Sequence, residues 1–176
     1  GAGWSGCAAA IRAVKQGHEA VLLEKTDLLL GLGNVGGIMR NNGRFTAAEE
    51  NIVLGASELF EITDRLSTHK NIDFPGHKHA SFYDVALVEP EVRRLLIKLG
   101  VELRLMCRAV DVVTEKREDA AVRIRSVTAV RLNHDGEYET VEIDGDVFVE
   151  TTGSTGPMGN CTKYGNGCSM CVLRCP

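Results

Sequence analysis

The sequence contains no apolar run long enough to cross a membrane and no excess of positive charge. A membrane-spanning helix needs ~20 consecutive apolar residues, and no stretch of the 176 residues approaches that length. The formal net charge of −4 gives no basic surface of the kind that binds nucleic acid. We therefore expect neither a membrane nor a nucleic acid among the partners of this chain.

An initiator methionine and a visible signal peptide are also missing. The chain begins at Gly1 and stops at Cys175-Pro176, within a second motif. We therefore expect an internal fragment of a longer protein, whose own N-terminus would carry any targeting signal. The 176 residues, 44% hydrophobic and 25% charged, are enough for one globular domain with a core but not for two full domains.

The first six residues form a glycine motif around which the rest of the chain is organised. Gly1, Gly3 and Gly6 spell GxGxxG, and the following residues predict a helix over 7–16 that ends at Gly17. In a strand-turn-helix unit these glycines allow a tight turn, close approach of a pyrophosphate and close packing of the helix on the strand. The free N–H groups and the dipole at the helix N-terminus also favour phosphate.

A short apolar strand that ends in an acid strengthens this motif. The strand is predicted over residues 19–24 and ends at Glu24, 18 residues after Gly6. A Rossmann carboxylate that binds ribose lies roughly 20 residues after the glycines. The negative charge of the Glu24 carboxylate would repel a 2′-phosphate, so the bound ribose should be unphosphorylated. FAD and NAD both meet this condition. A dinucleotide site is therefore the leading hypothesis.

A glycine-rich tract over residues 31–43 follows this strand, and helical periodicity follows over residues 46–68. We interpret the tract as backbone closely apposed to a flat or anionic ligand, with a mobile surface loop as the alternative. Three histidines lie near the end of the helical segment: His69, His77 and His79. We interpret them as solvated or locally hydrogen-bonded, because the same segment positions no third metal ligand.

The second half of the chain changes from a helix to strands. Glu89-Pro90-Glu91 should open a helix that ends at Gly100, because proline and acids favour the first turn. Five short strands should follow, separated by polar turns: Val101–Met106, Val110–Thr114, Val122–Leu132, Tyr138–Ile143 and Asp146–Val149. The last strand leads into a small-residue loop over residues 150–156, which in a doubly wound fold lies at the same sheet edge as the glycine motif.

Four of the six cysteines crowd the C-terminal residues: Cys161, Cys168, Cys171 and Cys175. Their last part, CxxCxxxCP, matches the end of the bacterial ferredoxin run that binds iron–sulfur clusters, although six residues rather than two separate Cys161 from Cys168. Zinc, a redox-active disulfide between Cys168 and Cys171, and structural thiols are the alternatives. Clustered thiols beside a βαβ pattern indicate metal or redox chemistry in a reducing compartment, so we expect a cytoplasmic protein.

Together these motifs resemble the FAD-dependent oxidoreductases of the glutathione-reductase-like superfamily. The matching elements are GAGWSG, VLLEK, a glycine-rich loop, a helix followed by GVEL, a meander, and an apolar strand ending in TTG. More narrowly, EPEVRRLLIKLGVEL and the cysteine-rich end resemble the iron–sulfur flavoproteins grouped with the heterodisulfide reductase A subunit. The resemblance implies an α/β, Rossmann-like FAD-binding fold: a βαβ core with an inserted antiparallel β-meander, lacking its first strand.

The resemblance also implies roles for individual residues. The glycines at 1, 3 and 6 would contact the FAD pyrophosphate, and Glu24 the adenosine ribose. Lys25 would border the adenosine, and backbone atoms of Val110 would meet the adenine edge. Gly153 would close near the flavin's phosphate or ribityl chain. Many relatives carry an Asp after this glycine where this sequence has Ser154, which leaves the role of Ser154 open.

The implied organisation is an incomplete FAD-binding domain over residues 1–156, with a helical insertion at about 46–88, and a truncated iron–sulfur ligand segment over 157–176. In such an enzyme FAD exchanges electrons with a [4Fe-4S] cluster held by the four clustered cysteines, and with a small-molecule or protein redox partner. No side chain is assigned as a general acid or base. An NAD-dependent dehydrogenase and a non-catalytic nucleotide-binding module with structural zinc are the alternatives.

Overall fold

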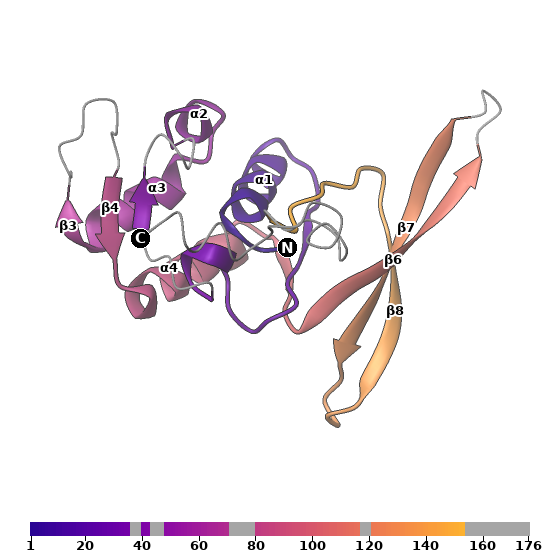
Figure 1. The fold of residues 1–176 in the computed structure, drawn as a ribbon. Coiled ribbons are helices and arrows are strands. Elements are labelled where there is room, and N and C mark those ends of the chain that lie inside the picture. The colour runs from indigo at the N-terminus through magenta and orange to yellow at the C-terminus, as the bar shows by residue number, and fades with distance from the viewer. Residues whose placement is uncertain (36–39, 43–47, 71–79, 117–120, 154–176) are drawn as a thin grey trace, which may run out of the picture.

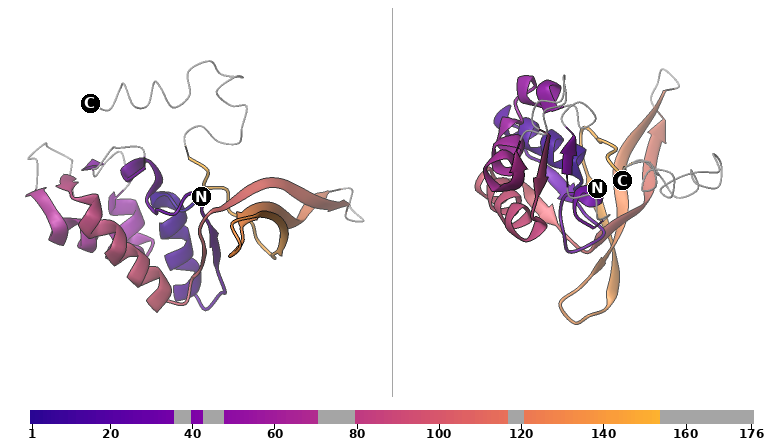
Figure 2. Two further views of the ribbon diagram at one scale, coloured as in Figure 1. Left: turned by 90° about the horizontal axis from the view of Figure 1, so that it is seen from below. Right: turned by 60° about the vertical axis from the view of Figure 1, so that its left-hand side comes forward.

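A computed structural model describes residues 1–35, 40–42, 48–70, 80–116 and 121–153. Helices gather around a short parallel sheet in one half of the molecule, and a long antiparallel meander projects from the other half (Figure 1). The same two parts are distinct in both views of Figure 2. The described residues include no helix that is both long and apolar enough to span a membrane.

The first unit is the predicted βαβ core. It contains helix α1 (Trp4–Lys15) and the parallel strands β1 (Val21–Leu23) and β5 (Glu102–Arg104). Parallel strands need a crossover connection, and here the chain between β1 and β5 supplies the other helices. Helix α1 begins three residues earlier than predicted, because Gly3 is its N-cap. Gly6 therefore lies inside the helix rather than before it.

The predicted helical stretch over residues 46–68 is two helices in the described part of the chain. They are α2 (Ala48–Val53) and α3 (Ser57–Leu66). Gly55 separates them with a φ of +98°, a left-handed conformation that glycine adopts without strain. The end of the stretch leaves the helix and forms a strand, β3 (Ser67–Lys70). Periodicity missed the break because the apolar positions continue across it.

Two further short strands join β3 in an antiparallel sheet. Strand β4 (Ala80–Tyr83) lies in the centre, between β3 and β2 (Arg40–Asn42). The sheet lies beside α3 and at the end of the molecule away from the meander (Figure 1). His69 belongs to β3, whereas His77 and His79 lie outside the described residues.

Helix α4 (Val85–Lys98) begins four residues before the predicted start at Glu89. Asp84 is the N-cap, and its Oδ1 accepts a hydrogen bond from the backbone N of Ala86 at 2.8 Å. This cap satisfies a free N–H at the true helix start, so Pro90 lies inside the helix rather than in its first turn. The predicted end is confirmed, because Gly100 follows the helix with a φ of +87°.

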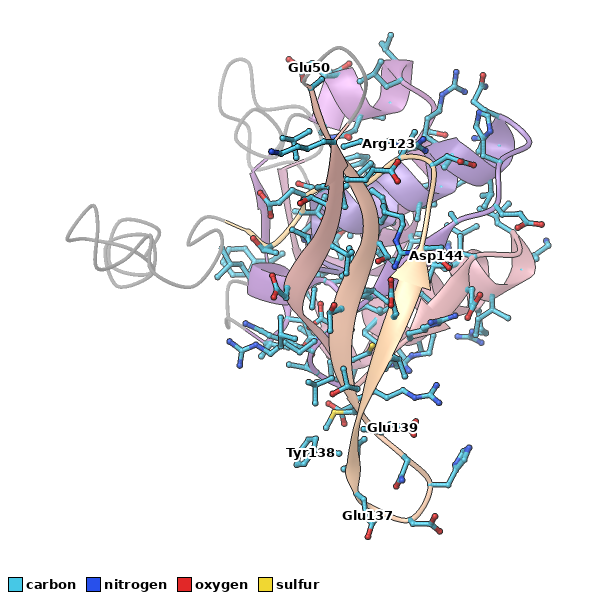
Figure 3. All side chains as sticks on the ribbon, turned by 90° about the vertical axis from the view of Figure 1, so that its right-hand side faces the viewer. Glu50, Arg123, Glu137, Tyr138, Glu139 and Asp144 are labelled. Carbon is cyan, nitrogen blue, oxygen red and sulfur yellow. The ribbon has the colours of Figure 1, made fainter. Side chains whose placement is uncertain are left out.

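The meander contains β6 (Cys107–Lys116), β7 (Val122–Leu132) and β8 (Tyr138–Asp144), paired in that order. In Figure 3 the turn between β7 and β8 ends at Glu137, and Tyr138 and Glu139 begin β8, while Arg123 and Asp144 lie towards the opposite end of the strands. The predicted strand at Asp146–Val149 is wrong. A short apolar run forms a strand only where the edge of another strand lies beside it, and no described strand pairs with this segment.

The main hydrophobic core lies between α1, α3, α4 and the parallel sheet. Its most deeply buried members are Ile11, Leu29, Leu30, Leu59, Phe60, Val88, Val92 and Leu96. A second, smaller cluster joins Cys107, Ala129 and Ile143 of the meander to Leu23 of β1. The meander is therefore anchored where β1 ends, next to Glu24, and the predicted mixed α/β core with an inserted antiparallel meander is confirmed.

Candidate functional site

The three glycines of the opening motif have different surroundings. A Cβ at Gly1 would lie 2.7 Å from the carbonyl oxygen of Thr151, and a Cβ at Gly6 would lie 2.0 Å from the carbonyl oxygen of Gly1. No side chain fits at either position. A Cβ at Gly3 would meet no heavy atom of the other described residues within 4 Å, apart from its two chain neighbours, and the φ of −68° and ψ of −175° there suit any residue. The packing of the chain itself therefore does not require glycine at position 3.

The open face of Gly3 lies at the N-terminus of α1. The carbonyl oxygen of Gly3 accepts the first helical hydrogen bond, from Cys7 N at 2.9 Å. The N–H groups of Trp4, Ser5 and Gly6 consequently have no acceptor within the helix. N–H groups without a helical acceptor and the positive end of the helix dipole are suited to binding an anion, and the absence of a side chain at Gly3 leaves room for one.

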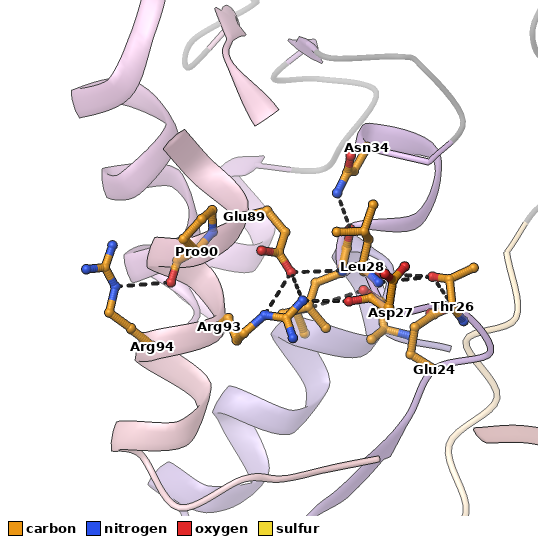
Figure 4. Close-up of polar contacts among 12 residues, drawn as sticks. Glu24, Thr26, Asp27, Leu28, Asn34, Glu89, Pro90, Arg93 and Arg94 are labelled. Carbon is orange, nitrogen blue, oxygen red and sulfur yellow. Dashed lines mark hydrogen bonds and ion pairs between the residues drawn. The ribbon is translucent and has the colours of Figure 1, made fainter. Parts of the chain in front are cut away.

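Glu24 lies directly beneath this loop, as the spacing predicted. Its carboxylate is 6% exposed, and its Oε2 accepts a hydrogen bond from Ala2 N at 2.8 Å. Its Oε1 accepts from both the N and the Oγ1 of Thr26, at 3.0 and 3.1 Å (Figure 4). A carboxylate has about four acceptor positions, so capacity for a ribose hydroxyl remains. Glu24 thus also holds the glycine loop in place, a role that the sequence did not reveal.

Thr26 is a further residue of the candidate site, which the sequence patterns did not indicate. It orients Glu24 through two bonds, and its hydroxyl also donates to the carbonyl oxygen of Leu28 at 2.9 Å. A threonine two residues after the strand-ending acid is a signal that could have identified it, because Ser and Thr hydroxyls bond to nearby backbone in turns.

The second small-residue loop meets the first, as predicted from the sheet edge. The hydroxyl of Thr151 donates to the carbonyl oxygen of Gly1 at 2.8 Å. Gly153 has a φ of +94°, and none of the other described residues lies within 4 Å of its Cβ side. The hydroxyl and N–H of Thr152 hold the pKa of Glu150 below its usual range. Ser154 lies outside the described residues.

The two residues expected near the adenosine lie at the surface. Lys25 is exposed, immediately after the buried Glu24. Val110 is 54% exposed and lies at an irregularity of the β6–β7 ladder. Ala109 pairs with Ala129 and the next pair is Asp111 with Thr128, so Val110 is the extra residue of a bulge. A bulge leaves backbone polar groups outside the ladder, where a planar base edge could meet them.

The start of the glycine-rich tract packs against the loop instead of lining an open surface. Leu30 forms a parallel bridge with Gly3, and its N donates to the carbonyl oxygen of Ala2 at 2.8 Å. A short 3₁₀ helix follows over Gly31–Gly33. A Cβ at Gly31 would lie 3.2 Å from the Cα of Gly3. The predicted ligand contacts of the tract beyond residue 35 fall mostly outside the described residues.

An aromatic cluster fixes the other side of this segment. Trp4 stacks on Phe60, with ring centroids 5.9 Å apart, and meets Tyr83 edge-on at the same distance. The hydroxyl of Tyr83 donates to the carbonyl oxygen of Gly33 at 3.0 Å, and burial raises the pKa of Tyr83 to about 12. A Cβ at Gly33 would lie 2.3 Å from Trp4 Nε1. Here glycine serves close packing within the chain.

The two isolated cysteines are buried free thiols. Cys7 donates from Sγ to the carbonyl oxygen of Ala2 at 3.4 Å, and burial raises its pKa to about 12. It is therefore a structural support of the loop and not a reactive thiol. The four predicted ligands, Cys161, Cys168, Cys171 and Cys175, lie outside the described residues. Within the described ranges no three His, Cys, Asp or Glu side chains are grouped to hold a metal.

Because the thiol of Cys7 is buried, we expect the folded protein to lose stability at alkaline pH. Below pH 9 Cys7 is protonated in both the folded and unfolded states; between pH 9 and about 12 only the unfolded state releases the proton. The free energy of unfolding should therefore fall with pH in this window, by roughly 1 kcal/mol per pH unit from this group. Urea unfolding of wild type and Cys7→Ala at pH 8, 9 and 10 measures it. Equal slopes for both proteins would contradict the assignment.

Comparison with known proteins gives one family match. Residues 1–156 match the sequence model of a family described as FAD dependent oxidoreductase. No curated protein matches the chain.

Three solved structures are similar in fold. THI4 from Thermovibrio ammonificans has a TM-score of 0.59 at 16% identity, over 88% of this chain and 55% of that one. FqzB has a TM-score of 0.51 at 18% identity, over 82% and 33%. Aklavinone-11 hydroxylase, in a ternary complex with FAD and aklavinone, has a TM-score of 0.52 at 17% identity, over 93% and 34%. The chain therefore spans about half of the first structure and a third of the other two.

Proposed function

The chain belongs to the family of FAD-dependent oxidoreductases, and from this membership we propose that its glycine loop binds FAD for electron transfer. The observation that supports the proposal is the contrast within the loop. Gly1 and Gly6 are needed by the chain's own packing, whereas the space beside Gly3, at a helix N-terminus and above a buried acid, holds none of the described side chains. A pyrophosphate bound at this point explains the missing side chain.

In this proposal each residue of the site contacts one part of FAD. The N–H groups of Trp4 and Ser5 would hold the pyrophosphate beside Gly3, and the remaining acceptor capacity of Glu24 would bind the adenosine ribose. Lys25 would border the adenosine, and the bulged backbone at Val110 would meet the adenine. Gly153 would lie near the phosphate or ribityl chain. FAD supplies the exchange of electrons in pairs or singly.

We further propose that the C-terminal cysteines bind a [4Fe-4S] cluster, which exchanges electrons with the flavin. The support is the spacing of Cys168, Cys171 and Cys175-Pro176, with Cys161 as the fourth thiolate. The expected partner is a small-molecule or protein redox carrier, and the expected location is the cytoplasm, where thiolates stay reduced. Such a cluster would place the protein among the iron–sulfur flavoproteins that the sequence resembles.

Anaerobic purification tests both parts of the proposal. The protein should carry one FAD, with flavin absorbance bands, and a broad absorbance near ~400 nm from iron and sulfide. Cys171→Ser should lose most of the iron and keep the FAD, because the thiol is not part of the flavin site. A colourless protein with stoichiometric zinc would refute both parts, and nicotinamide binding without flavin would indicate a dehydrogenase.

A further inference from the structure

From the contacts around Glu89 and Arg93 we infer that this pair on α4 positions the glycine loop for FAD, although neither residue reaches the loop itself. The inference rests on the proposed FAD site. Glu89 lies on the inner side of α4, with its side chain 8% exposed, and Arg93 follows one turn later with 30% exposure. The two side chains form an ion pair, and Glu89 Oε1 also accepts from Arg93 Nε at 3.0 Å.

Glu89 and Arg93 both form hydrogen bonds with the backbone of the turn over residues 27–30, which follows Glu24. Glu89 Oε1 accepts a hydrogen bond from Leu29 N at 3.3 Å, and Arg93 Nη2 donates to the carbonyl oxygen of Asp27 at 2.6 Å (Figure 4). One carboxylate and one guanidinium therefore hold two backbone groups of the same turn. Charged partners make these bonds stronger than bonds between neutral groups.

The far end of this turn holds the glycine loop. Leu30 is a buried non-glycine residue with a φ of +74°, and such a conformation persists only where the surroundings enforce it. The bond from Leu30 N to Ala2 and the bridge to Gly3 then fix the loop. A continuous path of bonds thus runs from Arg93 and Glu89, through residues 27–30, to the open face of Gly3.

Helix α4 begins more than fifty residues after the turn in the chain. The helix and the turn can therefore each form from their own local contacts, without the bonds between them. These bonds fix where the turn lies, and through it the distance between the N-terminus of α1 and Glu24. Glu89 and Arg93 are therefore positioning residues, which act on FAD only through the backbone of the turn and the loop.

The test compares Arg93→Lys with Arg94→Lys. Arg94 is the matched control on the same helix, because it pairs with Glu91 at 2.6 Å, bonds to Pro90 and points away from the turn (Figure 4). A lysine at 93 keeps the charge but lacks the planar guanidinium, in which Nε and Nη2 both donate to Glu89 while Nη2 also donates to Asp27. We expect its Kd for FAD to rise about tenfold, within the range of coupling between linked sites. Arg94→Lys should stay within about twofold of wild type.

The measurement uses holoprotein stripped of FAD and titrated with it, alongside the thermal midpoint of each apoprotein. Glu89→Gln is a second variant, which keeps the shape of the side chain and should also weaken FAD binding. A purely structural role would lower the thermal midpoint without changing the Kd. Equal Kd values for wild type, Arg93→Lys and Glu89→Gln would overturn the inference while leaving the FAD site intact. A wild-type protein that binds no FAD would overturn the proposed function, and this inference with it.

Discussion

Replacing Gly3 with valine should abolish FAD retention while the protein stays folded. The isopropyl group would occupy the space beside the N-terminus of α1 where, apart from the adjoining residues, no atom of the described chain lies within 4 Å of the Cβ position. The pyrophosphate would then lose its approach to the free N–H groups. We expect the Kd for FAD to rise at least about 100-fold, equivalent to roughly 3 kcal/mol of binding free energy.

The same substitution should cost little stability. The backbone at Gly3 is extended, with a φ of −68°, and valine at an N-cap position costs about 1 kcal/mol relative to a favoured cap. Flavin absorbance after gel filtration gives FAD retention, and urea unfolding of the apoprotein gives stability. Full FAD retention by a folded Gly3→Val protein would show that the pyrophosphate lies elsewhere.

Replacing Gly6 with valine should prevent folding, even though Gly6 belongs to the same loop. A Cβ at this position would lie 2.0 Å from the carbonyl oxygen of Gly1 and 3.0 Å from Thr151 Oγ1. Both atoms lie where the glycine loop meets the loop over residues 150–156. The carbonyl oxygen of Gly1 is a backbone atom, which cannot rotate away as a side chain can. Relief requires α1 to move off the sheet, which also disrupts the bonds of Ala2 and Cys7. We expect a loss of about 4 kcal/mol or more, a large share of the stability of a small domain.

Circular dichroism and the yield of soluble protein measure this effect. Gly3→Val is the matched control, because it puts the same side chain in the same loop, at a position with open space. Near-native stability of Gly6→Val would contradict the close packing of α1 on the first residues. The two variants therefore distinguish two reasons for glycine in the motif. Gly3 leaves room for a ligand, and Gly6 leaves room for the backbone of the chain itself.

The parts of the fold that depend on local chemistry were predictable from the sequence. The βαβ core, the strands of the meander and the helix end at Gly100 all carry their own periodicity or a left-handed glycine. The predicted start of α4 was wrong, because Pro90 and the acids beside it form a stronger helix-start pattern than Asp84, the residue that caps the helix. The segment Asp146–Val149 has the short apolar run of a strand, but pairing depends on a neighbouring edge that the residue pattern does not report.

The candidate site also has parts that the sequence predicted and parts that it did not. The spacing from Gly6 to Glu24 brought the acid under the loop, because one helix and one short strand have little freedom in length. The contacts that fix the loop were not predictable, since Leu29 and Glu89 lie sixty residues apart in the chain. Trp4 and Tyr83 likewise meet only in three dimensions. Long-range partners of this kind have no signature in spacing.

The central claim is that FAD binds at the glycine loop, and Trp4 allows a direct test. It is the only tryptophan of the 176 residues, and it occupies the first position of α1, next to Gly3. Titration of the apoprotein with FAD should quench its emission to saturation at one FAD per chain, and Gly3→Val should remove the quenching. Stoichiometric FAD binding that leaves the emission of Trp4 unchanged would contradict the assignment of the loop.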